Sequence, residues 1–342
     1  MNAARWKTKN RGKPIVSFGV DIATDTSRSE AHLRRIVLYR LYVQSRMNKI
    51  ITRIKGGLGN QLFCYAAARR LALVNNAELV IDDVTGFARD QQYHRQYALD
   101  HFYVPVRKAT PKERMEPFER HRRGLMKWLS RRRPFAERRY VEQEGLDFDK
   151  RLLDLNVRGA LYLDGLWQSE GYFKDIEQTI REDLRIIPPT DAANQCMAED
   201  IRNSNAVALH VRRFDAQGST ETHNISADYY QRAIALIEEK IEFPRYFLFS
   251  DEPEAARAML ALPEGRVTFV SHNQGDENAY ADLWLMTQCR HFVTANSTFS
   301  WWGAWLGEEM EKIVISPELE IREGKITAWN FSGQIPSGWL KI

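Results

Sequence analysis

Residues 49–74 read KIITRIKGGLGNQLFCYAAARRLALV and decide the architecture of the first half of the chain. Residues 49–54 are rich in β-branched side chains, which is typical of a strand. A glycine-rich turn follows over residues 55–59, and apolar residues then recur at helical spacing over residues 61–74. This order of strand, turn and helix predicts the first unit of a mostly parallel α/β sheet.

Further strands and helices extend outward from this stretch. The expected strands are residues 78–81, 160–163, 206–211, 246–249, 267–270, 291–295 and 312–315. The expected helices are residues 228–240, 253–260, 280–288 and 300–310. Residues 85–164 show no regular pattern, and residues 186–194, with Pro188 and Pro189, are expected to be a linker. We therefore expect domains at residues 47–190 and 191–342, after a basic extension at residues 1–46.

Length and composition limit the protein class. The chain has 342 residues, of which 44% are hydrophobic and 27% charged, so disordered and fibrous architectures are excluded. The three cysteines, Cys64, Cys196 and Cys289, lie far apart without metal-ligand spacing, which disfavours a disulfide framework and a zinc site. The sequence has neither an apolar run of about 20 residues nor a signal peptide. We expect a soluble cytoplasmic protein.

The formal net charge of +4 is unevenly distributed. Residues 1–46 hold ten Lys and Arg against three acids, a net of +7, so the remaining residues carry 4 − 7 = −3. We expect the extension to be disordered or to precede a true start near Met47; the alternative is an arm that binds a membrane surface or a partner.

A second basic block, residues 107–139, holds thirteen Lys and Arg against four Glu. It is either a solvated face or a surface that attracts an anionic membrane or acceptor. Its Lys and Arg residues are not interleaved with aromatic residues that could stack on nucleobases, so we expect no nucleic acid partner. A carbohydrate-binding module remains an alternative suggested by nine tryptophans, although most lie on apolar helix faces.

Polar residues follow several expected strands, at the sheet edge where parallel α/β proteins bind ligands. After residues 206–209 come His210, Arg212, Arg213 and Asp215. Paired guanidinium groups match phosphate oxygens, so they predict a diphosphate site; the alternative is a surface arginine pair bridged to Asp215. His210 alone is more typical of a packed, hydrogen-bonded core histidine than of a catalyst.

Two more strand ends add candidate residues. Asp251 follows the strand that ends at Phe249 and could accept hydrogen bonds from a ribose or a guanine edge. Asn296, Ser297, Thr298 and Ser300 stand at a helix start, where N–H groups and hydroxyls favour phosphate. Capping by Ser297 or Ser300 is the alternative and is compatible with anion binding.

The turn at Gly56–Gln61 has the placement of a phosphate-binding loop but a different pattern. It lacks the GxGxxG spacing and the Lys-Ser ending of a P-loop, which disfavours dinucleotide-binding dehydrogenases and P-loop enzymes. Gly57 and Gly59 still allow a ligand to approach the backbone closely.

Five segments, in order, resemble bacterial α-1,2-fucosyltransferases of glycosyltransferase family 11. They are GGLGNQLF at 56–63, DGLWQSEGYF at 164–173, HVRRFD at 210–215 with the residues from His223 to Tyr230, ADL at 281–283, and ANSTFSWWGAWL at 295–306. The resemblance implies a GT-B type fold, with two Rossmann-like doubly wound domains facing across a cleft. Residues 47–190 are expected on the acceptor side, and residues 191–342 are expected to bind the GDP-sugar donor. The resemblance also implies GDP-β-L-fucose as donor, a terminal β-galactoside as acceptor, inversion to an α-1,2 link, and no metal or other cofactor. The alternative is a related transferase that uses another GDP-sugar or a non-galactose acceptor.

The resemblance also implies roles for individual residues. Arg212 is expected to bind the β-phosphate with support from Arg213, with His210 and Asp251 near the nucleoside. The diphosphate is expected near the helix start and the glycine turn, at Asn296, Ser297, Thr298, Ser300, Gly57, Gly59, Asn60 and Gln61. Asp215 is the first candidate for the general base and His223 the second. Phe214 departs from the family pattern, which usually has glycine there, so the loop that leads to Asp215 is expected to differ in shape.

The same resemblance suggests where the protein works. It implies a bacterial cytoplasmic enzyme that acts on lipid-linked or lipopolysaccharide precursors and contacts the anionic inner membrane peripherally. The basic block at residues 107–139 is the expected point of contact.

Overall fold

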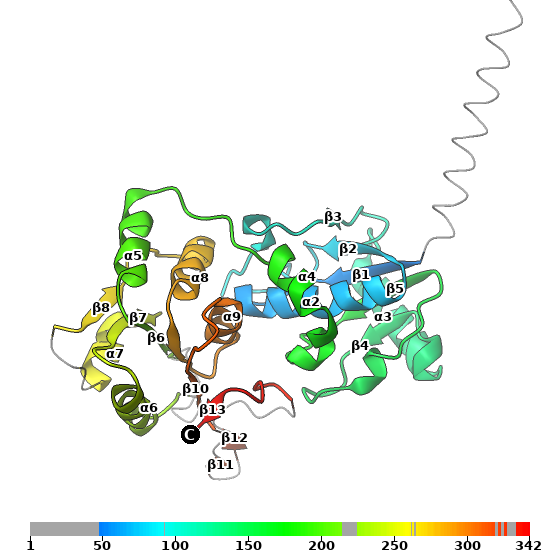
Figure 1. Ribbon diagram of the computed structural model, residues 1–342. Helices are drawn as coiled ribbons and strands as arrows, with labels where there is room; N and C mark the ends of the chain where they lie inside the picture. Colours follow the sequence, from blue (N-terminus) through cyan, green and yellow to red (C-terminus); the bar gives the residue numbers. More distant parts are fainter. Residues whose placement is uncertain are drawn as a thin grey trace, which may run out of the picture. The chain divides into compact units, whose positions relative to one another are not determined.

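Two parallel sheets with flanking helices organise the chain (Figure 1). The computed structural model describes residues 48–342 except 92, 214–223, 261, 263–264, 319–320, 323–324 and 327–332. Residues 48–342 belong to one compact unit. The predicted α/β class with parallel sheets is confirmed, whereas the boundary between residues 190 and 191 stays a prediction.

The first sheet has the strand order β3-β2-β1-β5-β4, and every neighbouring pair is parallel. Its strands are β1 (Lys49–Arg53), β2 (Glu78–Asp82), β3 (Arg107–Lys108), β4 (Tyr140–Glu142) and β5 (Ala160–Asp164). Because β1 lies between β2 and β5, the last residues of these three strands share one edge of the sheet.

The second sheet has the order β13-β10-β9-β6-β7-β8, and it is also parallel throughout. Its strands are β6 (Ala206–Val211), β7 (Arg245–Ser250), β8 (Val267–Val270), β9 (His291–Val293), β10 (Val314–Ser316) and β13 (Leu340–Lys341). A short antiparallel pair, β11 (Ile321–Arg322) and β12 (Lys325–Ile326), stands apart from both sheets.

Side chains alternate across β6, so each face of the second sheet has its own core. Val207 and Leu209 pack into the cluster that includes α6 (Ala227–Lys240) and α7 (Pro253–Met259). Ala206 and Ala208 belong to the other cluster, with α5 (Ala192–Arg202), α8 (Ala279–Thr287) and α9 (Thr298–Leu306). Figure 1 shows these helices on opposite sides of the sheet.

The first sheet is covered in the same way. Ile50, Leu79 and Leu161 face α2 (Leu58–Val74), whereas Ile51, Val80 and Tyr162 face α3 (Glu119–Arg131). Twelve of the 17 residues of α2 are buried, because α2 lies between the first sheet and α9. The ring of Phe63 in α2 is tilted against the rings of Trp301 and Trp302, and the ring centroids lie 4.6 and 4.9 Å apart. The two sheets therefore share one hydrophobic cluster.

The predicted strands and helices of both halves are confirmed with small shifts at their ends. Two regions differ from expectation. Residues 85–164, expected to be irregular, contain β3, α3 and β4, and α4 (Glu177–Asp183) also lies in the first half. The predicted linker ends early, because the Asp191 side chain accepts from the Asn194 N–H at 2.9 Å and starts α5 at Ala192.

Candidate active site

Arg212, Arg213 and Asp251 meet at the carboxyl edge of the second sheet. Val211 of β6 is paired with Ser250 of β7, so the residues that follow them are neighbours. Arg212 Nη1 lies 2.6 Å from Asp251 Oδ2, and the Arg213 N–H donates to Asp251 Oδ1 at 3.1 Å. One carboxylate therefore holds the guanidinium of Arg212 and the backbone of Arg213.

His210 is the buried member of this group. It is 6% exposed, and its ring centroid lies 5.6 Å from that of Phe299, in the first turn of α9. Burial, helped by the charge of Arg212, lowers the pKa of His210 to about 3, so its imidazole is neutral at pH 7. No residue in the described part of the chain hydrogen-bonds His210 Nδ1. A buried polar atom of this kind is suited to a ligand or an ordered water.

The start of α9 carries the other predicted residues of this half. The Ser297 side chain accepts from the Phe299 N–H at 3.3 Å and caps the helix. Ser300 Oγ accepts from the Ala295 N–H and donates to the Ser297 carbonyl. Asn296, 5% exposed, and Ser297 line a small pocket with Ser316 of β10. The capping alternative is thus confirmed, and it leaves the positive helix end available to an anion.

The glycine turn begins α2 next to this helix start. Gly56 has a φ of +77°, a conformation that favours glycine, and Gly57 begins the helix without a side-chain cap. At Gly59 a Cβ atom would lie 2.5 Å from the Thr298 carbonyl carbon, so glycine is required for the approach of α9. Asn60 Oδ1 accepts from Thr298 Oγ1 at 3.1 Å and from Gln168 Nε2 at 2.8 Å. The two helix starts therefore touch.

Gln61 shapes the turn from within. It is fully buried, its Nε2 donates to the Gly56 and Gln96 carbonyls at 3.0 and 2.8 Å, and its Oε1 accepts from the Ala98 N–H at 2.9 Å. The side-chain amide is thereby engaged by backbone groups. Gln61 is placed to hold the turn in shape, and its ligand-binding role stays a prediction.

Arg95 is a cation beside this turn that sequence reasoning missed. A Cβ atom on Gly57 would lie 3.6 Å from Arg95 Cζ, and the guanidinium forms an ion pair with Asp276. Asp276 belongs to a short helix, η8 (Asp276–Asn278), just before α8. Arg95 thus adds positive charge at the junction of the two halves; its place after an irregular loop offered no sequence signal.

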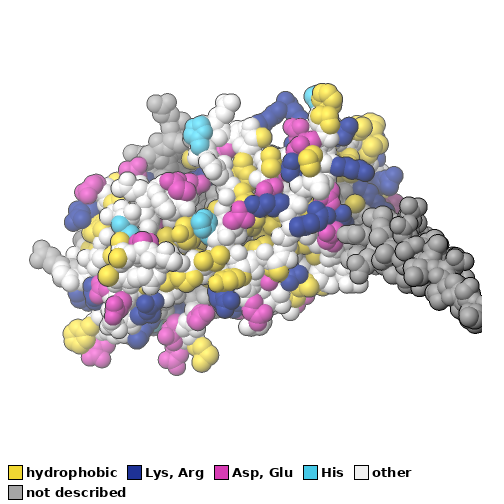
Figure 2. Space-filling model, turned by 90° about the horizontal axis from the view of Figure 1, so that it is seen from above, with side chains coloured by type: hydrophobic (Ala, Val, Ile, Leu, Met, Phe, Trp, Pro, Cys, Tyr) yellow, Lys and Arg dark blue, Asp and Glu magenta, His cyan; other side chains and the backbone are white. Residues whose placement is uncertain are grey.

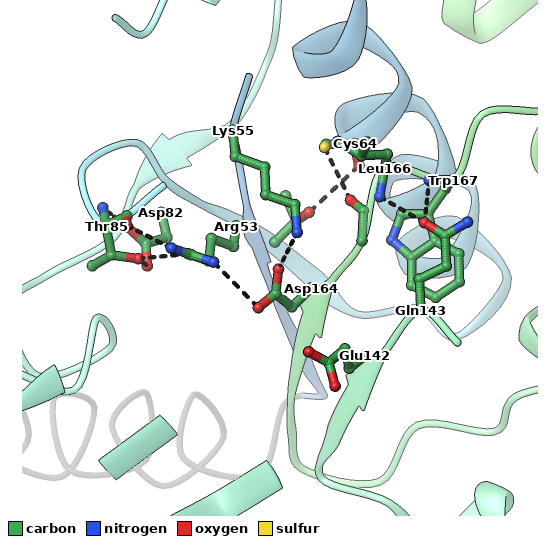
Figure 3. A network of polar contacts seen from close by, with 12 residues as sticks. Arg53, Lys55, Cys64, Asp82, Thr85, Glu142, Gln143, Asp164, Leu166 and Trp167 are labelled. Carbon is green, nitrogen blue, oxygen red and sulfur yellow. Dashed lines mark hydrogen bonds and ion pairs between the residues drawn. The ribbon is translucent and has the colours of Figure 1, made fainter. Parts of the chain in front are cut away.

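A second missed group lies at the carboxyl edge of the first sheet (Figure 3). Asp164, at the end of β5, accepts from Lys55 Nζ at 2.7 Å, from Arg53 Nη1 at 3.4 Å and from Tyr140 OH at 2.7 Å. Burial opposes ionisation, yet the charges of Lys55 and Arg53 lower the pKa of Asp164. The carboxylate stays ionised and anchors Lys55 directly before the glycine turn.

Arg53 extends this network to the neighbouring strand end. Its Nη2 donates to the Thr85 carbonyl at 2.7 Å, and its Nε donates to Thr85 Oγ1 at 3.2 Å. Thr85 in turn donates to Asp82, which also accepts from Tyr162 OH. Sequence reasoning could have found Arg53, Asp82 and Asp164, because each ends a strand in a parallel sheet.

Both candidates for the general base lie outside the described residues, since Asp215 and His223 fall within 214–223. Their roles stay predictions. The other predicted residues all lie at or shortly after the carboxyl ends of β1, β6, β7 and β9, or in the first turns of α2 and α9. Among the described residues, no three His, Cys, Asp or Glu side chains are grouped to hold a metal ion. No helix in the described ranges is long and apolar enough to cross a bilayer.

Comparisons with known proteins extend this description. The model of a family described as Glycosyl transferase family 11 matches residues 49–320. An α-1,2-colitosyltransferase of Escherichia coli is 26% identical over 301 residues, which cover 86% of this chain and 99% of that protein. The O-antigen biosynthesis glycosyltransferase WbnK of Escherichia coli is 29% identical over 282 residues, covering 77% and 92%. Among solved structures, the fucosyltransferase NodZ from Bradyrhizobium is similar at 16% identity and a TM-score of 0.48, covering 84% and 99%.

Proposed function

This chain belongs to glycosyl transferase family 11, and from that premise we propose that it transfers L-fucose from GDP-β-L-fucose to a glycan. The proposed acceptor is the 2-hydroxyl of a terminal β-galactoside, in a surface glycan or its precursor. The observation that carries the donor assignment is the group formed by His210, Arg212 and Asp251 beside the start of α9. This group brings together, at one sheet edge, a guanidinium, a carboxylate and a buried imidazole nitrogen that has no hydrogen-bond partner among the described residues.

The diphosphate is proposed to lie between this edge and the two touching helix starts. The starts of α2 and α9 each carry the positive end of a helix dipole, and their contact at Gly59 and Thr298 brings these ends together. Like partial charges in contact are stabilised by an anion. A guanidinium has five N–H donors, so Arg212 can keep Asp251 and bind a phosphate oxygen.

The proposed reaction is a single displacement at the anomeric carbon with inversion. The bond between that carbon and the GDP oxygen breaks as the acceptor oxygen attacks, and negative charge grows on the departing diphosphate. Arg212, fixed in advance by Asp251, stabilises this charge more in the transition state than in the ground state. We propose that guanidinium groups supply the positive charge without a metal ion, and that Asp215 or His223 takes the acceptor proton.

A second donor is favoured by one comparison. A relative that is 26% identical is named an α-1,2-colitosyltransferase, so another GDP-sugar could replace GDP-fucose in the same site. The contacts to the diphosphate would be unchanged, because they do not involve the sugar. We also propose a cytoplasmic enzyme that meets its acceptor at the inner membrane; the relative named for O-antigen biosynthesis supports this.

The test is GDP release from GDP-fucose in EDTA, with and without lactose or N-acetyllactosamine. The parent chain is compared with Arg212→Ala and with the control Arg232→Ala, whose exposed arginine pairs with Asp228 on α6. We expect acceptor-dependent release from the parent and the control, and a loss of roughly 100-fold or more in Arg212→Ala. GDP-colitose serves as the second donor.

The outcomes separate the parts of the proposal. Release only from GDP-colitose would move the donor assignment and keep the phosphate site. Equal release by Arg212→Ala and the parent would overturn the role of Arg212. No release from either donor, together with no GDP binding, would overturn the proposed function.

A further inference from the structure

Helix α3 has an inward face that completes the first half of the protein. Met126 packs against the cluster on the outer face of the first sheet, and Ser130 Oγ accepts from the Tyr140 N–H at 3.0 Å. Lys127, on the same face, forms an ion pair with Glu142. These contacts fix the rotation of α3 about its own axis, so its opposite face is determined as well.

The outward face of α3 is a ridge of large apolar side chains. Phe118, Leu125, Trp128 and Leu129 are 69%, 57%, 52% and 47% exposed. Residues 118, 125 and 129 recur at helical spacing, so they lie along one stripe with Trp128 beside it. Contiguous exposed apolar side chains of this size mark an interaction surface more often than a solvated face.

Helix α3 and the two residues that follow it are strongly basic. Residues 119–133 hold seven Lys and Arg and one Glu, a net of 7 − 1 = +6. Glu142 pairs with Lys127 and Arg131, whereas Arg120, Arg122, Arg132 and Arg133 have no acidic partner within the described part of the chain. Figure 2 shows Lys and Arg side chains gathered beside hydrophobic ones over the half that carries the first sheet.

Arg132 joins the basic and apolar parts of the surface. Its Cζ lies 3.2 Å from the centroid of the Trp128 ring, so the guanidinium covers the indole. A stacked arginine and tryptophan present an apolar body with a cationic tip, which suits the boundary between lipid headgroups and acyl chains.

We propose that α3 docks the protein on an anionic lipid bilayer, with Leu125, Trp128 and Leu129 inserted and the flanking arginines bound to headgroups. Charge complementarity selects this occupant. A second copy of the chain would bring two helices of net +6 together, which like-charge repulsion opposes. A nucleic acid would pair with the arginines but would leave the apolar ridge exposed to water.

This docking gives the proposed reaction a location. α3 covers the first sheet, in the half to which the acceptor is assigned, so a lipid-linked acceptor would meet that half first. This last step rests on the proposed function. The docking itself depends only on the surface of α3, and vesicle binding tests it without a donor or an acceptor.

The experiment is co-sedimentation of the full chain with vesicles of phosphatidylcholine alone and with phosphatidylglycerol added. One variant combines Arg122→Gln, Arg132→Gln and Arg133→Gln, and another combines Leu125→Gln, Trp128→Gln and Leu129→Gln. The matched controls are Arg202→Gln, Arg232→Gln and Arg257→Gln together, and Phe243→Gln with Met310→Gln, whose apolar side chains are 77% and 95% exposed. Far-UV circular dichroism and thermal unfolding of each variant report folding.

We expect the parent and both controls to bind the anionic vesicles and to bind phosphatidylcholine weakly. The arginine variant should lose about tenfold or more in affinity for anionic vesicles. The apolar variant should keep binding at low salt and lose it at high salt, because only the screened electrostatic part remains. Three results would overturn the proposal: unchanged binding by both α3 variants, equal losses in the controls, or binding of RNA in preference to vesicles.

Discussion

Gly59 and Thr298 lie in direct contact, although they belong to helices that follow strands of different sheets. Gly59 is in α2, which follows β1, and Thr298 begins α9, which follows β9. A Cβ atom built on Gly59 would lie 2.5 Å from the Thr298 carbonyl carbon and 2.6 Å from its oxygen. The next residue, Asn60, hydrogen-bonds Thr298 across 238 positions of sequence. The contact joins the carboxyl edges of the two sheets, where the proposed site lies.

Gly59→Ala should separate these two helix starts. The added methyl group meets backbone atoms that cannot rotate away, so we expect a loss of about 1–3 kcal/mol in the free energy of unfolding. Thermal or urea unfolding measures it. GDP binding should weaken as well, since the change moves the start of α9.

Gly124→Ala is the matched control for this substitution. Gly124 lies inside α3, and apart from its chain neighbours and the backbone of its own helix no described residue lies within 4 Å of a Cβ atom built there. Replacing a helical glycine with alanine should stabilise the protein by up to about 1 kcal/mol. A loss of stability at Gly124 equal to that at Gly59 would contradict the steric explanation.

Asp251→Ala should slow the chemical step as well as weaken donor binding. Without the carboxylate, the Arg212 guanidinium and the Arg213 backbone lose a shared anchor. We expect kcat/KM for the nucleotide sugar to fall roughly tenfold or more, with much of the loss in kcat, because Arg212 is proposed to act mainly in the transition state.

Asp200→Ala provides the comparison for Asp251. Asp200 holds Arg245 through contacts of 2.6 and 2.8 Å, at the amino end of β7 and thus at the opposite edge of the same sheet. This pair has similar chemistry but lies away from the proposed site. A fall in kcat/KM in Asp200→Ala as large as that in Asp251→Ala would refute the assignment.

His210→Gln should change how stability depends on pH. Burial lowers the pKa of His210 to about 3, below the ordinary value near 6.5. Between these values the unfolded chain binds a proton that the folded protein does not. Above pH 6.5, His210 is neutral in both states and does not change the free energy of unfolding with pH. As the pH falls from 6.5 toward 3, it lowers the free energy of unfolding progressively.

Urea unfolding of the parent and His210→Gln at pH 7, 6 and 5 measures this effect. The parent should lose stability more steeply, with a difference approaching about 1.4 kcal/mol per pH unit below the unfolded pKa. A difference between the two proteins that stays constant from pH 7 to 5 would show that the pKa of His210 is the same in the folded and unfolded states.

The strands were predictable because local sequence determines them. All six residues of β6 are buried, and buried parallel strands appear in a sequence as short runs of apolar residues. Helix α3 was missed because most of its large apolar side chains lie on its exposed face and only Met126 packs against the sheet. Leu125, Trp128 and Leu129 face outward, while Ser130 and the stem of Lys127 face the sheet.

The polar network of the first sheet depended on strand order. Arg53 and Asp164 are 111 residues apart, and they meet because β5 pairs with β1. Asp82 joins them from the other side of β1. Nothing in the local sequence of any of the three residues states which strand will be its neighbour.

The sequence by itself determined the α/β class, the positions of the main strands and the family, because periodicity and ordered motifs are local properties of the chain. Only the tertiary structure decided that the starts of α2 and α9 touch, that Asp251 holds Arg212, and that α3 turns an apolar ridge outward. Each of these depends on which surfaces pack together, and packing is set by contacts between residues far apart in sequence.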